Sequence, residues 1–160
     1  MRWFRLAAEQ GLARAQNKLG LSYAESEGVP QDDAKAVRWY RLAAEQGLSN
    51  AQYNLGFMYD NGRGVPEDDP EAARWWRLAA DQGEVDAQVN LGLMYEYGDG
   101  VPQDDVQAHM WFNIAASRST GTQHANAVED RDEIANRLTP DQRAEAQRLA
   151  REWDEAHARD

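Results

Sequence analysis

Three pairs of neighbouring aspartates are the first residues in the sequence whose spacing could do chemistry. They are Asp32-Asp33, Asp68-Asp69 and Asp104-Asp105. Two adjacent carboxylates could hold a divalent cation or act as proton donor and acceptor. The pairs recur every 36 residues, however, so each occupies the same loop of a repeating unit, too far from the next pair to share one ion. We therefore predict a structural role, in which the second aspartate of each pair (Asp33, Asp69 and Asp105) caps the N-terminus of a helix.

The histidines are the next candidates for catalysis. His109, His124 and His157 each fall in a different predicted element, with no serine or cysteine nucleophile at a recognisable spacing. His109 also takes the place that Val37 and Ala73 fill in the two preceding units, which indicates a tolerated substitution. The glycine pairs at 62–64 and 98–100 end helices instead of opening them after a strand, so they do not form a phosphate loop. The sequence predicts no catalytic residue, no metal site and no cofactor.

Tryptophans could form an aromatic ligand box. They stand at positions 3, 39, 75 and 111, with Trp76 beside the third. A ligand site is not expected to recur in every unit, whereas a hydrophobic core is needed between every pair of neighbouring units. We therefore predict that these tryptophans pack in the core.

Composition narrows the function classes further. The chain has 160 residues, 42% hydrophobic residues, no cysteine and a net charge of −11. The lack of cysteine excludes disulfides, thiolate metal sites and thiol nucleophiles. The acidic balance disfavours nucleic acid, because binding a phosphate backbone needs a cationic surface. No apolar run reaches the about 18 residues that a membrane-spanning helix needs, so no membrane insertion is predicted.

Each unit contains two helical patterns separated by turn residues, and we name the first helix A and the second helix B. In the unit from 48 to 83, the apolar stripes are Ala51, Leu55 and Tyr59 on helix A, and Ala72, Trp76 and Ala79 on helix B. Gly56 and Gly92 on the A helices are expected to let two helices approach closely. Ser26 replaces the glycine found at 62 and 98, so we expect the first loop to follow a different path.

The repeated unit resembles the Sel1-like repeat of bacterial type, a relative of the tetratricopeptide repeat. The resemblance is carried by Ala-x-x-x-Leu-Gly-x-x-Tyr, Gly-x-Gly-Val-Pro-x-Asp and Ala-x-x-Trp-x-x-x-Ala-Ala-x-Gln-Gly. It implies an all-α fold, a right-handed α-α superhelix of stacked helix hairpins, and a binding role. The predicted organisation is a partial first helix at 1–11, repeats at about 12–47, 48–83 and 84–118, and C-terminal capping helices at 119–160. We expect a longer connection at 117–122, a charged helix at about 123–138, and a last helix from Pro140 capped by Thr139.

The A helices carry a second set of positions on the face turned away from the apolar stripe. In tetratricopeptide proteins the corresponding positions line a concave groove and contact peptides, so the resemblance implies a groove here. The predicted groove residues are Arg14, Asn17, Leu21, Asn50, Tyr53, Phe57, Asp60, Asp86, Val89, Leu93, Glu96 and Tyr97. Exposed apolar side chains in such a set need a covering partner. The alternative is that solenoid curvature buries them against the next A helix.

The predicted function is a non-enzymatic scaffold that binds a peptide or protein segment in this groove, as a monomer. One alternative is a structural spacer, or a fragment of a larger regulatory or exported protein, because the sequence starts inside a helix B. A remote alternative is a β-lactam-binding or hydrolysing enzyme, since a cysteine-rich branch of the resembled family is associated with that activity. The compartment stays open: cytoplasmic from this chain alone, and periplasmic or exported if an N-terminal segment is missing.

Overall fold

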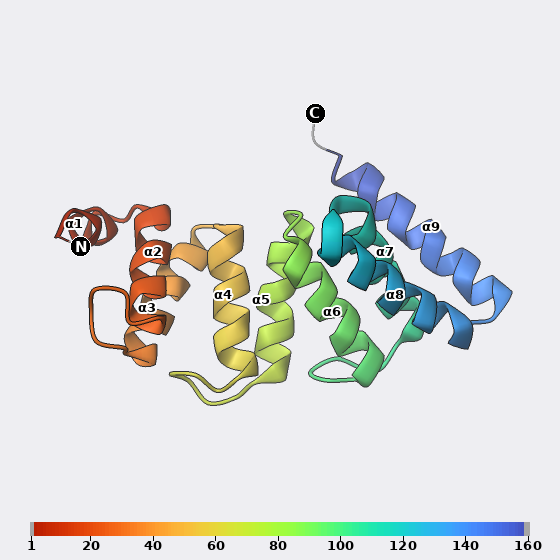
Figure 1. Cartoon of the computed structure of the whole chain (residues 1–160), viewed down its shortest axis with the longest axis horizontal. Coiled ribbons are helices and arrows are strands. Elements are labelled where there is room, and N and C mark those ends of the chain that lie inside the picture. Colours follow the sequence, from red (N-terminus) through yellow and green to blue (C-terminus); the bar gives the residue numbers. More distant parts are fainter. Residues whose placement is uncertain (1, 159–160) are drawn as a thin grey trace. The chain divides into compact units, whose positions relative to one another are not determined.

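The computed structural model describes residues 2–158, with side chains from residue 5 onward, and this part of the chain is all-helical. Its helices are α1 (Arg2–Glu9), α2 (Ala13–Ala24), α3 (Asp33–Glu45), α4 (Ser49–Asp60), α5 (Asp69–Asp81), α6 (Val85–Tyr97), α7 (Asp105–Arg118), α8 (Gly121–Arg137) and α9 (Pro140–Ala156) (Figure 1). They form two compact units, one ending at Ala79 and the other beginning at Ala80. The all-α fold class predicted from the sequence is confirmed.

In the first unit, each helix packs against the next along the chain from α1 to α4. Its core includes Leu55, Met58 and Tyr40, all buried. Glycine permits the closest approach between the helices of one hairpin. A Cβ on Gly20 would lie 2.7 Å from the Tyr40 ring, and a Cβ on Gly56 would lie 2.6 Å from the indole of Trp76. The close approach predicted at Gly56 is therefore confirmed, and the partner in each case is an aromatic ring of helix B.

A buried glutamine joins each A helix to the end of the preceding B helix. The Nε2 groups of Gln16, Gln52 and Gln88 donate to the carbonyls of Ala8, Ala44 and Ala80, at 3.2, 3.2 and 3.1 Å. Each of these carbonyls also accepts a hydrogen bond from the backbone N–H of Gly11, Gly47 or Gly83, at 3.0, 2.9 and 2.9 Å. The buried glutamine is therefore a second donor to the carbonyl, and it ties the A helix to the end of the B helix. The same bond in each repeat explains why Ala-Gln recurs at this position.

Most of the predicted tryptophan core is present. Trp75, Trp76 and Trp111 are 6%, 3% and 0% exposed. Trp39, in contrast, is only partly buried, and it packs at the margin of the cluster that Ala8, Ala15 and Leu19 form. Trp39 therefore contacts the core without being enclosed in it. The side chain of Trp3 lies outside the described residues.

The aspartate pairs cap their helices one residue earlier than predicted. The first aspartate of each pair accepts the backbone hydrogen bond: Asp32 from Lys35, Asp68 from Glu71, and Asp104 from Val106 and Gln107. The second aspartates, Asp33, Asp69 and Asp105, are the first helical residues, where a negative charge interacts favourably with the helix dipole. Asp33 also forms an ion pair with Arg63 at 2.8 Å.

The first loop keeps the path of the other loops, contrary to the prediction at Ser26. Ser26 adopts φ = 60°, the same left-handed conformation as Gly62 at 59°. The backbone bonds also match, because Glu27 donates to Ser22 as Arg63 donates to Met58. The surrounding hydrogen bonds therefore impose the left-handed conformation on a residue that does not favour it.

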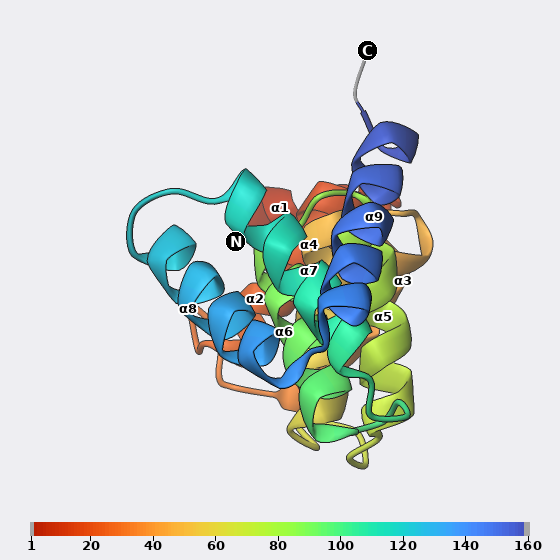
Figure 2. The same cartoon turned by 90° about the vertical axis from the view of Figure 1, so that its right-hand side faces the viewer.

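In the second unit, α7 packs against α6, α8 and α9 (Figure 2). The long connection predicted at 117–122 is absent, since α7 ends at Arg118 and α8 begins at Gly121. Ser117 and Ser119 end α7 by donating back to the carbonyls of Ile114 and Ala115, a use of serine that the sequence pattern does not separate from a loop. Thr139 caps α9 in a capping box with Gln142, as predicted for the cap. Among the described helices none is long and apolar enough to cross a membrane.

Candidate interaction surface

In the first unit, the predicted groove residues lie on α2 and α4. Arg14, Asn50 and Phe57 are exposed, whereas Asn17, Leu21, Tyr53 and Asp60 are partly buried. A hydrogen bond of 3.1 Å from Asn54 to Asn17 joins the two helices on this side. The structure thus places these seven residues on two neighbouring A helices, and the most prominent apolar side chain among them is Phe57, which is 38% exposed.

Tyr53 has a packing role that the sequence pattern does not reveal. Its ring stacks on that of Trp76, with centroids 6.5 Å apart and an interplanar angle of 29°. The indole N–H of Trp76 donates to the carbonyl of Tyr53 at 3.1 Å. Tyr53 therefore holds α4 to α5 in addition to any contact with a ligand.

In the second unit, α8 engages several of the predicted residues of α6. Gln123 donates to Asp86 at 2.5 Å, and Val89 packs against the buried cluster that includes Ala127. Glu96 is 8% exposed and pairs with Arg137 at 3.2 Å. Burial raises the pKa of the Glu96 carboxyl, and the neighbouring Arg137 opposes that rise. The residues of α6 that stay exposed are Asp86, Leu93 and Tyr97, the last two at 36% and 65%.

The histidines have structural surroundings. Nδ1 of His124 lies 2.8 Å from the carbonyl oxygen of Ala116. This contact is the equivalent, 36 positions later, of the hydrogen bond from Gln88 to the carbonyl of Ala80. His157 stacks on Trp153 with ring centroids 4.2 Å apart. His109 is 3% exposed, its Nδ1 has no hydrogen-bond partner among the described residues, and burial lowers its pKa. Within residues 2–158, no group of three or more histidine, aspartate or glutamate side chains is arranged to hold a metal ion.

Two pockets lie in the first unit along α3, on the B-helix side. One has a volume of about 280 Å³ and is lined by Arg5, Glu9, Tyr23, Lys35, Arg38, Trp39 and Leu42. The other has about 480 Å³ and includes Arg38, Arg41, Leu42 and Val65. Neither pocket includes any of the twelve predicted groove residues. The pocket that contains Trp39 was not predicted from the sequence, because the repeat pattern assigns this tryptophan to the core. The signal that could have found the pocket is Lys35, which stands where the next repeat has Glu71.

Stacked helix hairpins of 36 residues, each closed by an aromatic side chain on a glycine, define a tetratricopeptide-like repeat protein. The Sel1 repeat profile matches residues 1–12, 13–48, 49–84 and 85–119. The chain therefore belongs to the Sel1 repeat family, whose members are generally non-enzymatic scaffolds for protein–protein interaction.

Solved structures agree with this assignment. The chain is similar to c5321, described as a protective antigen present in uropathogenic Escherichia coli strains displaying an SLR fold. The identity is 39% and the TM-score 0.87, over 98% of this chain and 33% of that chain. It thus spans a third of the length of that protein. A Sel1 repeat protein from Oxalobacter formigenes is 38% identical with a TM-score of 0.70, over 79% of this chain and 95% of that one.

The cysteine rich protein B of Helicobacter pylori shares the fold alone. It is 22% identical with a TM-score of 0.61, over 78% of this chain and 90% of that chain. A search of curated proteins found no match.

Proposed function

We propose that this chain is a non-enzymatic, monomeric scaffold that binds a peptide or protein segment on the exposed face of its A helices. The proposed site in the first unit is the surface formed by Arg14, Asn17 and Leu21 of α2 together with Asn50 and Phe57 of α4. In the second unit, Leu93 and Tyr97 are the exposed hydrophobic members of the same set. The family's general role in protein interactions supports a protein partner.

The single observation that carries this proposal is the exposure of Phe57. Leu21, Phe57 and Leu93 occupy the same position of three successive repeats, and Phe57 and Leu93 are 38% and 36% exposed. The Phe57 ring thus leaves part of its apolar surface in contact with water in the folded chain. Burying such a ring in a complex, however, contributes strongly to binding, since aromatic residues are enriched among the residues that dominate interfaces.

Selection from a displayed peptide library, followed by affinity measurement with variants, tests the proposal. We expect Phe57→Ala to weaken the selected peptides by about tenfold or more, which corresponds to an interface residue of intermediate importance. Phe57→Ala is more informative than Tyr53→Ala, because Tyr53 also stacks on Trp76. Leu78→Ala is the matched control, since Leu78 is 40% exposed but lies on α5. Peptides that respond to the change at Leu78 and not at Phe57 would reject the A-helix face as the site.

A further inference from the structure

The first unit contains two copies of one arrangement of side chains, built around successive B helices. The first copy consists of Arg5, Tyr23, Lys35, Arg38 and Trp39, and the second consists of Arg41, Tyr59, Glu71, Arg74 and Trp75. Each residue of the first copy has its equivalent 36 positions later. The residue types agree except at one position, where Lys35 in the first copy stands in place of Glu71 in the second.

In the second copy, the carboxylate of Glu71 is bound by the arginine and tryptophan of the same arrangement. Glu71 accepts hydrogen bonds from Nε and Nη2 of Arg74 at 2.9 and 2.6 Å, and from the indole N–H of Trp75 at 3.0 Å. The guanidinium of Arg74 lies over the Trp75 ring, 4.2 Å from its centroid. Arg74 lowers the pKa of the Glu71 carboxyl, as expected where hydrogen bonds favour the charged form.

The first copy has the same cationic and aromatic groups without that carboxylate. Lys35 turns instead to Asp32, at 2.6 Å, and lies over the Tyr23 ring, 5.5 Å from its centroid. Arg5 and Arg38 form no ion pair, and the indole N–H of Trp39 donates no hydrogen bond, with the residues that the structure describes. The position that Glu71 fills in the second copy is therefore left open.

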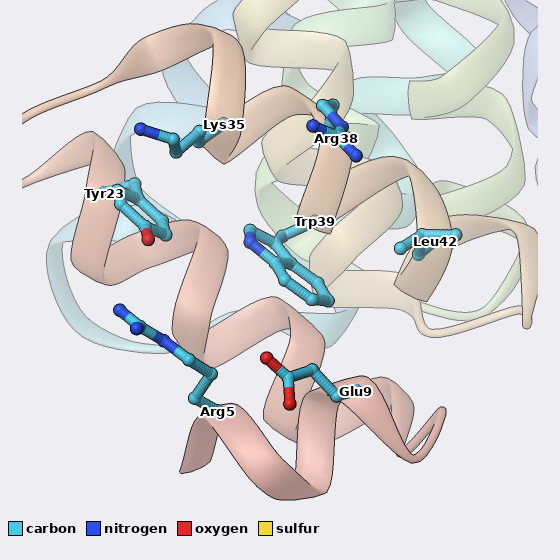
Figure 3. A pocket seen from close by; sticks show the side chains of 7 residues that line it. All are labelled: Arg5, Glu9, Tyr23, Lys35, Arg38, Trp39 and Leu42. Carbon is cyan, nitrogen blue, oxygen red and sulfur yellow. The ribbon is translucent and has the colours of Figure 1, made fainter. Parts of the chain in front are cut away.

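The open position is a pocket of about 280 Å³ (Figure 3). Arg5 of α1 and Lys35 of α3 lie on either side of Tyr23, and the nitrogen-bearing edge of Trp39 is on the side of Tyr23. Leu42, which is 45% exposed, adds an apolar wall. Three cationic side chains around one acidic one, Glu9, make this pocket a local exception in a chain of net charge −11.

We propose that this pocket binds the carboxylate of a glutamate or aspartate side chain in a partner protein segment, with an apolar neighbour of that residue against Leu42. The second copy shows which groups such a carboxylate would meet: the guanidinium of Arg38 and the indole N–H of Trp39. A carboxylate fits better than a phosphate group because Glu9 lines the pocket and repels a second negative charge. The volume is at the small end for ligand sites and suits one or two side chains. This site is separate from the A-helix face proposed above.

The dipeptide acetyl-Glu-Leu-amide is the probe, and acetyl-Gln-Leu-amide is its neutral counterpart. NMR follows the indole N–H signals, of which that of Trp39 is assigned with the variant Trp39→Phe. We expect the glutamate probe to shift the Trp39 signal and the glutamine probe to bind about fivefold more weakly, the upper range for one partly exposed ion pair. Arg38→Ala should weaken the glutamate probe by a similar factor, and Glu9→Gln should strengthen its binding.

Exchanging the one residue that differs between the copies tests whether the first copy is a binding site or only a structural cluster. Lys35→Glu supplies an internal carboxylate next to Arg38, so it should abolish binding, whereas Lys35→Gln should weaken it far less. Glu71→Lys should open the second copy and make the Trp75 signal respond to the probe. If Glu71→Lys unfolds the chain, Glu71→Ala serves in its place, because it removes the internal carboxylate without adding a charge.

Two results would overturn the proposal: no response of Trp39 up to the solubility limit of the probe, or equal affinities for Lys35→Glu and Lys35→Gln. Circular dichroism of each variant confirms that it is folded. Phe57→Ala should leave binding of the glutamate probe unchanged, so this site and the A-helix face can fail independently.

Discussion

Replacing Gly64 by alanine should destabilise the first unit strongly, for two reasons that can be separated. Gly64 has φ = +72°, a left-handed conformation that costs an alanine about 1–2 kcal/mol. A Cβ at this position would also overlap with the backbone carbonyl of Asp33 and the amide nitrogen of Ala34. Backbone atoms cannot rotate aside as a side chain does, so the loop must move, at about 1–3 kcal/mol for an overpacked site.

The expected loss for Gly64→Ala is therefore about 2–5 kcal/mol of unfolding free energy. Gly47→Ala is the matched control, because Gly47 has φ = +85° but nothing lies within 4 Å of a Cβ there. It should lose about 1–2 kcal/mol, the conformational part alone. Moving the loop also disturbs the ion pair between Arg63 and Asp33.

Urea denaturation followed by circular dichroism measures both changes as shifts of the midpoint. The reasoning predicts a clearly larger shift for Gly64→Ala than for Gly47→Ala. Equal shifts would refute the steric part, because both positions share the left-handed conformation and differ in the space around the added methyl group.

Further variants test the packing and the pH dependence. Ser26→Gly should raise the unfolding free energy by about 0.5–1 kcal/mol, since relief of the left-handed conformation exceeds the entropy lost by glycine, and a decrease in urea melts would contradict this. Trp75→Ala should lower the unfolding free energy by about 3–5 kcal/mol in the same melts, and Trp39→Ala should lower it clearly less because Trp39 is partly exposed. Equal losses for the two variants would contradict this difference in burial. His109→Val should be at least as stable as the parent chain at pH 7, because the buried Nδ1 has no partner among the described residues. Burial lowers the pKa of His109, so the unfolded state takes up a proton before the folded state does as the pH falls, and the stability of the parent chain declines. Thermal melts between pH 7 and 5 should show a weaker decline for His109→Val. Identical pH profiles would show that the protonation of His109 does not limit stability.

The sequence predicted the helices and their apolar faces because both depend on local, repeated patterns. Ala51 and Leu55 recur at the helical spacing, and the structure buries both. The glycine at position 56 was a sound guide to close packing for the same reason. The predictions failed where a contact outside the pattern decides the outcome. Ser26 takes the left-handed conformation of a glycine because backbone bonds on either side impose it.

The twelve predicted groove residues show the same division. The sequence placed them on the A helices, and Phe57 is exposed as a groove residue must be. That Glu96 pairs with Arg137 and Val89 packs beside Ala127 depends on α8, which is distant in the sequence. The binding role of the set stays a prediction.

By itself, the sequence determined the 36-residue hairpin and its family, because these features follow from residue types at fixed local spacing. The tertiary structure alone decided which charged groups are satisfied internally. Glu71 meets Arg74 and Trp75, whereas Lys35 turns to Asp32 and leaves Arg38 without a carboxylate among the described residues. Such pairing depends on distances in space between side chains, and a repeat pattern that differs at one position does not reveal it.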